Sequence, residues 1–263
     1  MSTRRRVSTR VMGAVMLLVL GSCSGGTSSS SGDPPPSSSI VSTATSTVTT
    51  TSSSPPSTSS PPSTPSSTPG TTAPTGFTGT VTSVTAAELG ASYRDGCPVA
   101  PSDLRTLHMT YWGFDDQPHV GTMVVAASVA DDVLTVFHRL FDQHFPIRQM
   151  KPVEVFGGSD DASMAADNTS GFNCRYAVAP GPPQWSAHAF GTAIDVNTVE
   201  NPYLEDGEVR PPAGVAYTDR SSYRPGMAVP NGQLVQAFAA VGWQWGGRWT
   251  ASPDYQHFSR DGN

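Results

Sequence analysis

The sequence predicts an α+β domain in residues 79–263, built from a small, largely antiparallel sheet flanked by helices. Two observations predict this fold class. Short apolar or alternating segments of strand length recur along these residues, and one longer segment has helical periodicity. The two kinds of segment mix without the regular alternation that indicates a parallel sheet. A domain of this size buries its own core, and we expect a monomer.

The first elements of the domain are a strand, a helix and a second strand. The run MVVAA at Met123–Ala127 predicts a buried strand. Apolar residues recur at helical spacing over Ala130–Phe145, and Pro146 ends this predicted helix. We expect another strand over Lys151–Phe156. Residues 157–171 are polar and rich in turn-forming residues, so we expect a loop there.

The remaining elements are three strands and a short helix. Alternation over Phe172–Val178 predicts a strand, and Ala193–Val196 predicts the next one. Gln233–Val241 predicts a short helix that stops at Gly242. We expect Gln256–Ser259 to close the domain as a strand.

Residues 1–23 resemble the signal peptide of an exported lipoprotein. Four arginines precede an apolar run, Val11–Leu20, which is too short to span a bilayer as a mature helix. The segment LGSC that ends at Cys23 resembles the bacterial lipobox, in which the cysteine is lipid-modified. We therefore expect an exported protein, anchored through this lipid to the outer face of the bacterial cytoplasmic membrane and facing the cell wall. Ordinary signal cleavage near this point is the alternative.

Residues 24–78 predict a disordered tether. They are almost entirely Ser, Thr, Pro and Gly, with Asp33 as their one charged residue, and cannot bury enough apolar surface to offset the entropy of ordering. Four of the chain's 15 basic residues and one of its 21 acidic residues precede residue 79, which leaves the domain 11 against 20 and a net charge of −9. Nucleic acid is therefore not an expected partner.

Two cysteines remain once Cys23 is assigned to the lipobox. Cys97 and Cys174 form an even pair in a chain expected to fold in an oxidising compartment, and we expect them to form a disulfide. A cysteine metal site is the rival interpretation, but no CxxC spacing supports it.

The segment SAHAFGTAID places polar residues in apolar surroundings. It ends at Asp195 in a predicted strand, where an unpaired carboxylate costs several kcal/mol. Ala193 and Asp195 share one face of that strand, and Gly191 permits a bend that brings His188 back towards it. A metal ion bound by Asp195 would compensate this carboxylate. A buried aspartate that is satisfied by backbone amides is one alternative to such a metal site. A serine triad of Ser186, His188 and Asp195 is another, although no GxSxG motif is present.

A metal site needs more ligands than His188 and Asp195 supply. His257 is the natural third protein ligand, and a catalytic zinc leaves its fourth position to water. Asp254, three residues earlier, is placed to act as general base on that water. For the other four histidines we expect surface or turn positions: His108, His119, His138 and His144.

The pattern SxHxxGxAxD followed by an acid-x-x-His resembles the zinc peptidases of the D-alanyl-D-alanine carboxypeptidase family, which includes VanY-type carboxypeptidases and L-alanyl-D-glutamate endolysins. Gly242–Trp249 and Asp254–Phe258 are similar to the closing segment of the endolysin branch. Thr169–Arg175 resembles the strand that delivers the family's arginine. The resemblance implies a zinc peptidase domain of the hedgehog and DD-peptidase type.

The resemblance also implies roles for individual residues. The two histidines and the aspartate named above would hold one Zn2+, and Asp254 would activate the water. Arg175 would stabilise the developing oxyanion or bind a substrate carboxylate. Ser186 would hydrogen-bond the substrate or a metal ligand. Many members of the family carry Glu where this chain has Asp254, which makes the base one methylene shorter here.

The function implied is an extracytoplasmic zinc peptidase acting on peptidoglycan stem peptides. It would be a D-alanyl-D-alanine carboxypeptidase or an endopeptidase of the L-Ala-D-Glu type. Arg175, Arg220 or Arg224 would bind a free substrate carboxylate. The alternative from another class is a non-catalytic cell-wall-binding module that retains the fold. Tryptophans between residues 243 and 249 line a groove or belong to the core. A calcium loop is resembled in composition only by Asp160, Asp161, Ser163, Asp167 and Asn168, and the family resemblance favours a loop that lines the substrate cleft.

Overall fold

The computed structural model describes residues 74–178 and 181–262. The predicted signal segment, the lipobox with Cys23 and most of the predicted tether lie outside these residues. Along the part of the chain that the structure describes, no helix combines the length and apolar character needed to cross a membrane.

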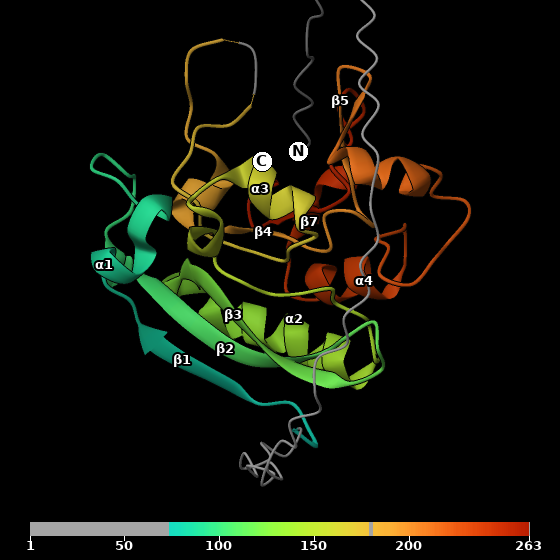
Figure 1. Ribbon diagram of the computed structural model, residues 1–263, viewed down its shortest axis with the longest axis horizontal. Coiled ribbons are helices and arrows are strands. Elements are labelled where there is room, and N and C mark those ends of the chain that lie inside the picture. The colour runs from blue at the N-terminus through green and yellow to red at the C-terminus, as the bar shows by residue number, and fades with distance from the viewer. Residues whose placement is uncertain (1–73, 179–180, 263) are drawn as a thin grey trace, which may run out of the picture. The chain divides into compact units, whose positions relative to one another are not determined.

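One layer of the domain is a three-stranded antiparallel sheet (Figure 1). Its order is β1-β2-β3, formed by Gly79–Ser83, Leu104–Trp112 and Pro118–Ala126. β2 alternates between faces, so that Leu107 and Met109 are buried while His108 between them is exposed. Met123 of β3 lies opposite Leu107 in the core. The predicted strand over Met123–Ala127 is therefore the second half of a longer strand.

Helix α2, Ala130–Asp142, packs its apolar stripe against this sheet. Its buried residues are spaced three and four apart, as the sequence predicts: Ala130, Val133, Val136, Phe137, Leu140 and Phe141. The helix ends three residues earlier than predicted. The backbone of His144 is left-handed, with φ of 53°, which a continuing helix does not permit.

A second small sheet lies on the other side of the same core. Its order is β4-β8-β7, formed by Ala193–Asp195, His257–Ser259 and Gln244–Trp245, and all pairs are antiparallel. Helix α4, Gln233–Ala239, covers it, because Phe238 stacks on Phe258 with ring centroids 4.2 Å apart. The predicted strands at residues 193–196 and 256–259 and the predicted helix at 233–241 are thus confirmed. So is the α+β fold class.

Two predicted strands are wrong. Lys151–Phe156 forms a 3-10 turn over Val153–Phe156, because Pro152 has no N–H to pair and Gly157 follows in the left-handed conformation. Phe172–Val178 crosses between the two sheets and forms one isolated bridge, between Tyr176 and Trp185. The N–H of Arg175 donates to the carbonyl of Asn173, and this tight turn interrupts the predicted strand.

Several elements were not predicted. Helix α3, Asp160–Ala165, forms where a loop was expected, since the Ser159 side chain caps its first turn. The hairpin of β5, Tyr203–Glu205, and β6, Glu208–Arg210, is also new. Strands β1, β2 and β7 and helix α1, Ala86–Leu89, complete this group.

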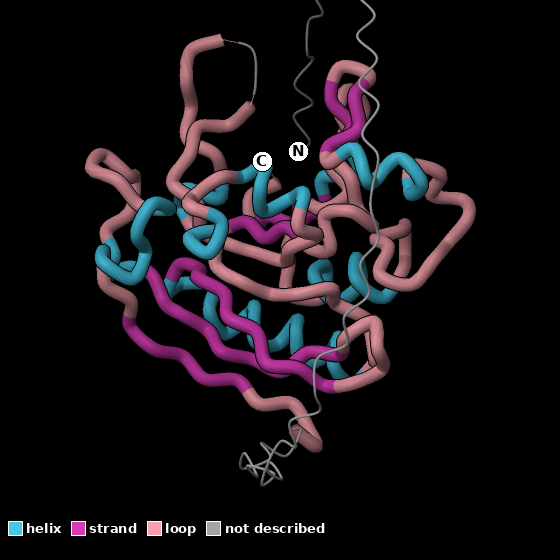
Figure 2. The backbone as a smooth tube through the Cα atoms, in the orientation of Figure 1, coloured by secondary structure: helices cyan, strands magenta, loops and turns pink. Residues whose placement is uncertain are grey.

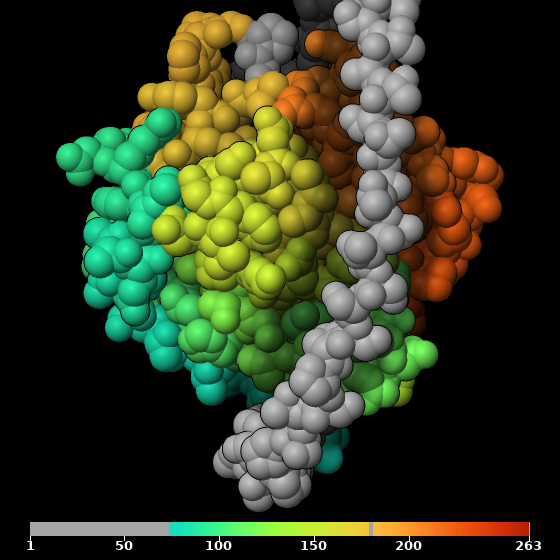
Figure 3. All heavy atoms as spheres, in the orientation of Figure 1, coloured from blue at the N-terminus to red at the C-terminus, as the bar shows by residue number. Residues whose placement is uncertain are grey.

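Loops and short 3-10 segments make up much of the layer that carries the second sheet (Figure 2). In the space-filling view, residues around α3 cover the face turned to the viewer (Figure 3). The 3-10 segments of the described residues are Gly90–Ser92, Pro101–Asp103, Ala127–Val129, Val153–Phe156, Ala187–Phe190, Pro212–Tyr217 and Gly246–Arg248.

Cys97 and Cys174 form the predicted disulfide, with Cα atoms 5.9 Å apart. Cys174 belongs to a second, smaller core with Leu89, Leu104 and Phe172. The bridge therefore joins the α1 region to the segment that crosses between the sheets.

A charge cluster with two buried carboxylates ties the segment after β4 to the rest of the domain. Arg148 contacts Asp167 at 3.1 Å and Glu200 at 2.9 Å, and its guanidinium lies 3.8 Å from the centroid of the Phe114 ring. The side chain of Glu200 is only 1% exposed. Burial, followed by the neighbouring Asp167 carboxylate, raises the pKa of Glu200 to about 7.

The disulfide should stabilise the domain strongly. It closes a loop with a sequence separation of 77 residues, for which the chain-entropy model gives about 4–5 kcal/mol. We expect the free energy of unfolding in urea to be lower by about this amount in the Cys97→Ala/Cys174→Ala variant. Reduction of the wild type should lower it similarly. Thiol labelling of the denatured, unreduced domain should detect neither cysteine. Two labelled thiols would contradict the bridge.

Glu200 should make stability depend on pH. Because its pKa is raised on folding, the native state binds more protons than the unfolded state between pH 4.5 and about 7. Stability from this group therefore falls as pH rises through that window, by roughly 1–3 kcal/mol. We expect Glu200→Gln to flatten this part of the pH profile of urea unfolding, whereas Asp103→Asn at an exposed position should not. Parallel profiles for wild type and Glu200→Gln would contradict the assignment.

Candidate active site

The pairing of β4 with β8 brings two polar side chains together. Asp195 lies opposite His257 in the register, and its Oδ1 is 3.3 Å from His257 Nδ1. The neighbouring pair, Ile194 and Phe258, is fully buried in the core. Since side chains alternate along a strand, Asp195 and His257 lie on the face opposite to that core.

A 3-10 segment, Ala187–Phe190, carries His188 to the same point. The hydroxyl of Ser186 accepts a hydrogen bond from the His188 backbone N–H and caps this segment. Gly191 ends it with φ of 67°, where a Cβ would lie 2.6 Å from the backbone nitrogen of Ala126. Only glycine fits there, so the predicted bend at Gly191 is present.

The three side chains meet at one point. His188 Nε2 is 3.2 Å from Asp195 Oδ2 and 3.2 Å from His257 Nδ1. Ligand atoms around a tetrahedral zinc with bonds of 2.0–2.1 Å are about 3.3 Å apart. All three residues are buried, and their ligand atoms lie within 4.8 Å of one another. This spacing fits a divalent metal ion.

The tautomer of His188 also fits metal binding. His188 Nδ1 lies 2.7 Å from the carbonyl oxygen of Gly171. A carbonyl only accepts, so Nδ1 carries the proton and Nε2 presents its lone pair to Asp195 and His257. The segment that follows Thr169 therefore orients one of the candidate ligands.

The carboxylate of Asp195 faces the two imidazoles. Burial alone would raise the pKa of Asp195, but His188 and His257 outweigh burial and hold this pKa well below its usual range. Burial alone would lower the pKa of His188, and Asp195 raises it above its ordinary value. The buried carboxylate is thus compensated by the ligand cluster and not by backbone amides.

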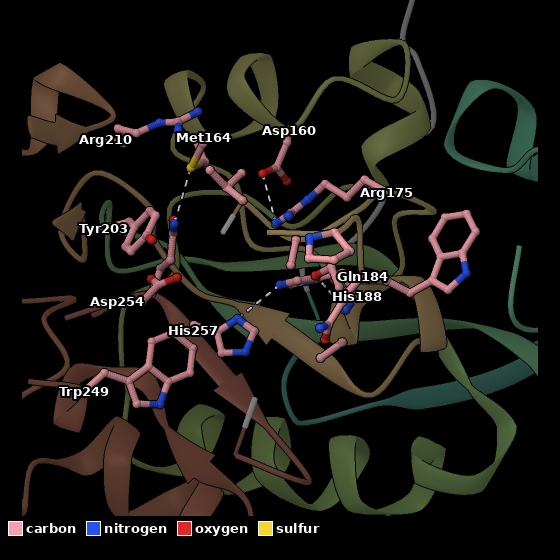
Figure 4. A pocket seen from close by; sticks show the side chains of 17 residues that line it. Asp160, Met164, Arg175, Gln184, His188, Tyr203, Arg210, Trp249, Asp254 and His257 are labelled. Atoms are coloured by element: carbon pink, nitrogen blue, oxygen red, sulfur yellow. Dashed lines mark hydrogen bonds and ion pairs between the residues drawn. The ribbon is translucent and has the colours of Figure 1, made fainter. Parts of the chain in front are cut away.

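A cavity of about 440 Å³ opens over this cluster (Figure 4). Side chains from α3, the β5–β6 hairpin and the chain's last residues line it together with the crossing segment. Among them are Asp160, Arg175, Tyr203, Arg210, Trp249 and Asp254.

Asp254 presents an unpaired carboxylate oxygen in this cavity. Its Oδ1 is buried, and no hydrogen-bond partner for it exists within the described residues. Its backbone is held by the Gly246 carbonyl and by a bridge to Tyr203. Burial raises the pKa of Asp254 to about 7, which is near the value that suits a general base at neutral pH.

Arg175 lines the cavity and is held by an unpredicted partner. Its Nη2 lies 2.9 Å from Asp160 Oδ2, while its Nε is buried and unpaired within residues 74–178 and 181–262. The polar, turn-rich composition of residues 157–171 predicts a loop at Asp160, and no local pattern indicates that this residue contacts Arg175. The segment 160–168 that resembled a calcium loop forms α3 and its C-terminal turn instead.

The other predicted cationic residues lie elsewhere. Arg220 donates to the carbonyl oxygen of Glu200 at 2.9 Å, and Arg224 lies 3.7 Å from the centroid of the Tyr217 ring. Neither lines the cavity, whereas Arg210 of β6 does. Arg210 pairs with Glu205 at 2.6 Å and with Asp161. The hairpin that carries Arg210 has no distinctive sequence pattern, so the sequence does not predict this residue as part of the site.

The remaining predicted residues differ in whether they lie at the cavity. The Ser186 hydroxyl accepts from the backbone of His188, an arrangement unlike the serine-to-imidazole bond of a triad. Trp243 and Trp245 belong to the core, and Trp249 lines the cavity with its ring 5.3 Å from that of His257. The histidines expected at the surface do not line the cavity: His108, His119, His138 and His144.

The domain is thus an α+β fold in which a buried His–Asp–His cluster floors a cavity that also holds a free carboxylate. Residues 180–260, which include the cluster and Asp254, match the family model described as D-alanyl-D-alanine carboxypeptidase. Over these residues the chain is similar to this family of peptidases. No curated protein and no solved structure matches the chain. The match does not separate the endolysin branch from the others.

The cluster should hold the metal of this domain. We expect His188→Ala, Asp195→Ala or His257→Ala each to lose most of the bound zinc, because each of the three side chains supplies one of the three protein ligand atoms. His138→Ala should keep it, since this exposed residue pairs with Asp142 on α2. Elemental analysis of each variant, refolded with zinc, measures its zinc content. Full zinc occupancy in His257→Ala would contradict the ligand set.

Proposed function

We propose that this protein is an extracytoplasmic zinc peptidase that hydrolyses a peptide bond in peptidoglycan stem peptides. The observation that carries the proposal is the buried cluster of His188, Asp195 and His257, with contacts of 3.2–3.3 Å, beside the unpaired carboxylate of Asp254. The family match adds the substrate class.

Zinc is the metal that the donor set favours. Two imidazole nitrogens and one carboxylate oxygen are typical zinc ligands, and three protein ligands leave a fourth position for water or substrate. When bound, the metal lowers the pKa of water and polarises the substrate carbonyl.

The chain's own residues supply the proton transfer and the positioning. Asp254, a carboxylate with a raised pKa and a free oxygen in the cavity, takes the proton from the attacking water and passes it to the leaving amine. Arg175 offers its unpaired Nε–H to a substrate oxygen. Asp160 positions Arg175 through their 2.9 Å contact.

The proposed location follows from the chain's first residues and its disulfide. The signal-like segment with Cys23 would place the domain outside the cytoplasmic membrane on a Ser/Thr/Pro-rich tether. The bridge between Cys97 and Cys174 is typical of exported proteins. A binding module without turnover is the competing function, but it would not need the free carboxylate of Asp254.

Mass spectrometry of a peptidoglycan digest tests the function and identifies the peptide bond that is hydrolysed. The zinc-loaded domain should release either terminal D-alanine, as a carboxypeptidase, or stem fragments, as an endopeptidase. Asp254→Asn should keep the zinc and lower kcat by roughly 10²–10⁴, because an amide of the same shape cannot take the proton.

The matched control is Asp131→Asn on the exposed side of α2, which should cleave at the wild-type rate. A nearly wild-type kcat in Asp254→Asn would refute the general base. Loss of both zinc and activity in Asp254→Asn would indicate that Asp254 is a metal ligand. An unchanged digest with the zinc-loaded wild type would refute the peptidase and favour the binding module.

A further inference from the structure

Gln256 carries a buried amide that the protein leaves incompletely bonded. The residue is 2% exposed, and its Nε2 lies 3.3 Å from the thioether sulfur of Met164, a weak acceptor. Its Oε1 is buried and has no partner within the described residues. Exchanging the two amide atoms would leave both without a partner, because the sulfur cannot donate to an oxygen, so at least one hydrogen-bonding atom is unsatisfied in either orientation.

This amide lies in the cavity and next to the chemistry. Gln256 stands between Asp254 and His257 in the sequence, and all three line the cavity with Met164 and Tyr203. Met164, Tyr203 and Asp254 lie on one side of it (Figure 4). Buried amides in folded proteins are almost always hydrogen-bonded, so an unpaired one in a cavity wall points to a ligand.

The surroundings indicate what kind of ligand this is. The arginines nearest to this part of the wall already have carboxylate partners, since Arg210 pairs with Glu205 and Asp161 and Arg175 pairs with Asp160. A charged group would have to compete with these pairs. An extended, neutral peptide main chain supplies both an N–H for Oε1 and a carbonyl oxygen for Nε2, because the N–H and C=O of one residue point to the same side.

We propose that Gln256 binds the main-chain N–H and C=O of one substrate residue close to the scissile bond. The side-chain carbonyl accepts the substrate N–H, and the side-chain amide donates to a substrate carbonyl. Gln256 thereby selects substrates that have an unsubstituted amide at this position. The inference rests on the proposed peptidase function and adds a substrate-binding residue to it.

The test uses the zinc-loaded enzyme and a synthetic peptide that contains the bond identified in the digest. Gln256→Met keeps the length of the side chain but forms no amide hydrogen bond. We expect KM to rise about tenfold, with kcat little changed and zinc retained, because a binding interaction is lost in ground and transition state alike. Gln244→Met, exposed on β7 and outside the cavity lining, is the control and should match the wild type.

A series of peptides with single N-methyl groups locates the contact. For one analogue the wild type should lose about tenfold in kcat/KM relative to the parent peptide. Gln256→Met should cleave that analogue and the parent equally well. Gln256→Asn, which keeps the amide but shortens it, should reproduce the rise in KM if Gln256→Met does not fold.

The possible outcomes distinguish the role of Gln256 from the peptidase function on which it rests. Wild-type KM in Gln256→Met, or the same N-methyl discrimination in variant and wild type, would overturn the role of Gln256 and leave the peptidase standing. Absence of cleavage by the zinc-loaded wild type would overturn the peptidase function and this inference with it.

Discussion

The register between β4 and β8 is the constraint on which the site depends. Ile194 and Phe258 pair across the two strands and are completely buried, so the alternation of side chains turns Asp195 and His257 to the opposite face. A slip of one residue would exchange the two faces and put a carboxylate into the core. The same apolar contacts that close the core therefore hold two of the candidate ligands 3.3 Å apart.

The first sheet positions the rest of the cluster through backbone hydrogen bonds. The carbonyl of Val124 accepts from Phe172, and the amide of Ala126 donates to the carbonyl of Gly191. These two bonds fix the segments that orient and carry His188. The disulfide at Cys174 ties the crossing segment to the α1 region just before Arg175. The first sheet contributes no candidate ligand, but its edge at β3 sets the position of one.

The walls of the cavity divide into paired and unpaired groups. Neighbouring residues at the start of α3, Asp160 and Asp161, hold Arg175 and Arg210, which come from two different segments. In contrast, Asp254 and Gln256 each keep a buried polar atom without a partner. Paired charges shape the walls, whereas unpaired groups are the ones left for water and substrate. This division supports a single reaction centre beside His257.

Sequence alone determined the features that depend on local pattern and residue chemistry. The spacing of polar residues around Gly191 singled out His188 and Asp195, the acid-x-x-His pattern added His257, and the structure brings the three together. Helical periodicity predicted α2, and the even pair of cysteines predicted the disulfide. These signals lie within one segment or follow from a small number of candidates.

Only the tertiary structure decided which distant segments share the cavity. Arg210 lines it and Arg220 does not, although both lie between β4 and α4 in the sequence. Asp160 meets Arg175 because α3 forms where a polar loop was expected. Gln256 stands out only because its surroundings leave its amide unpaired. Burial and pairing of polar groups depend on non-local packing, which no local sequence pattern encodes.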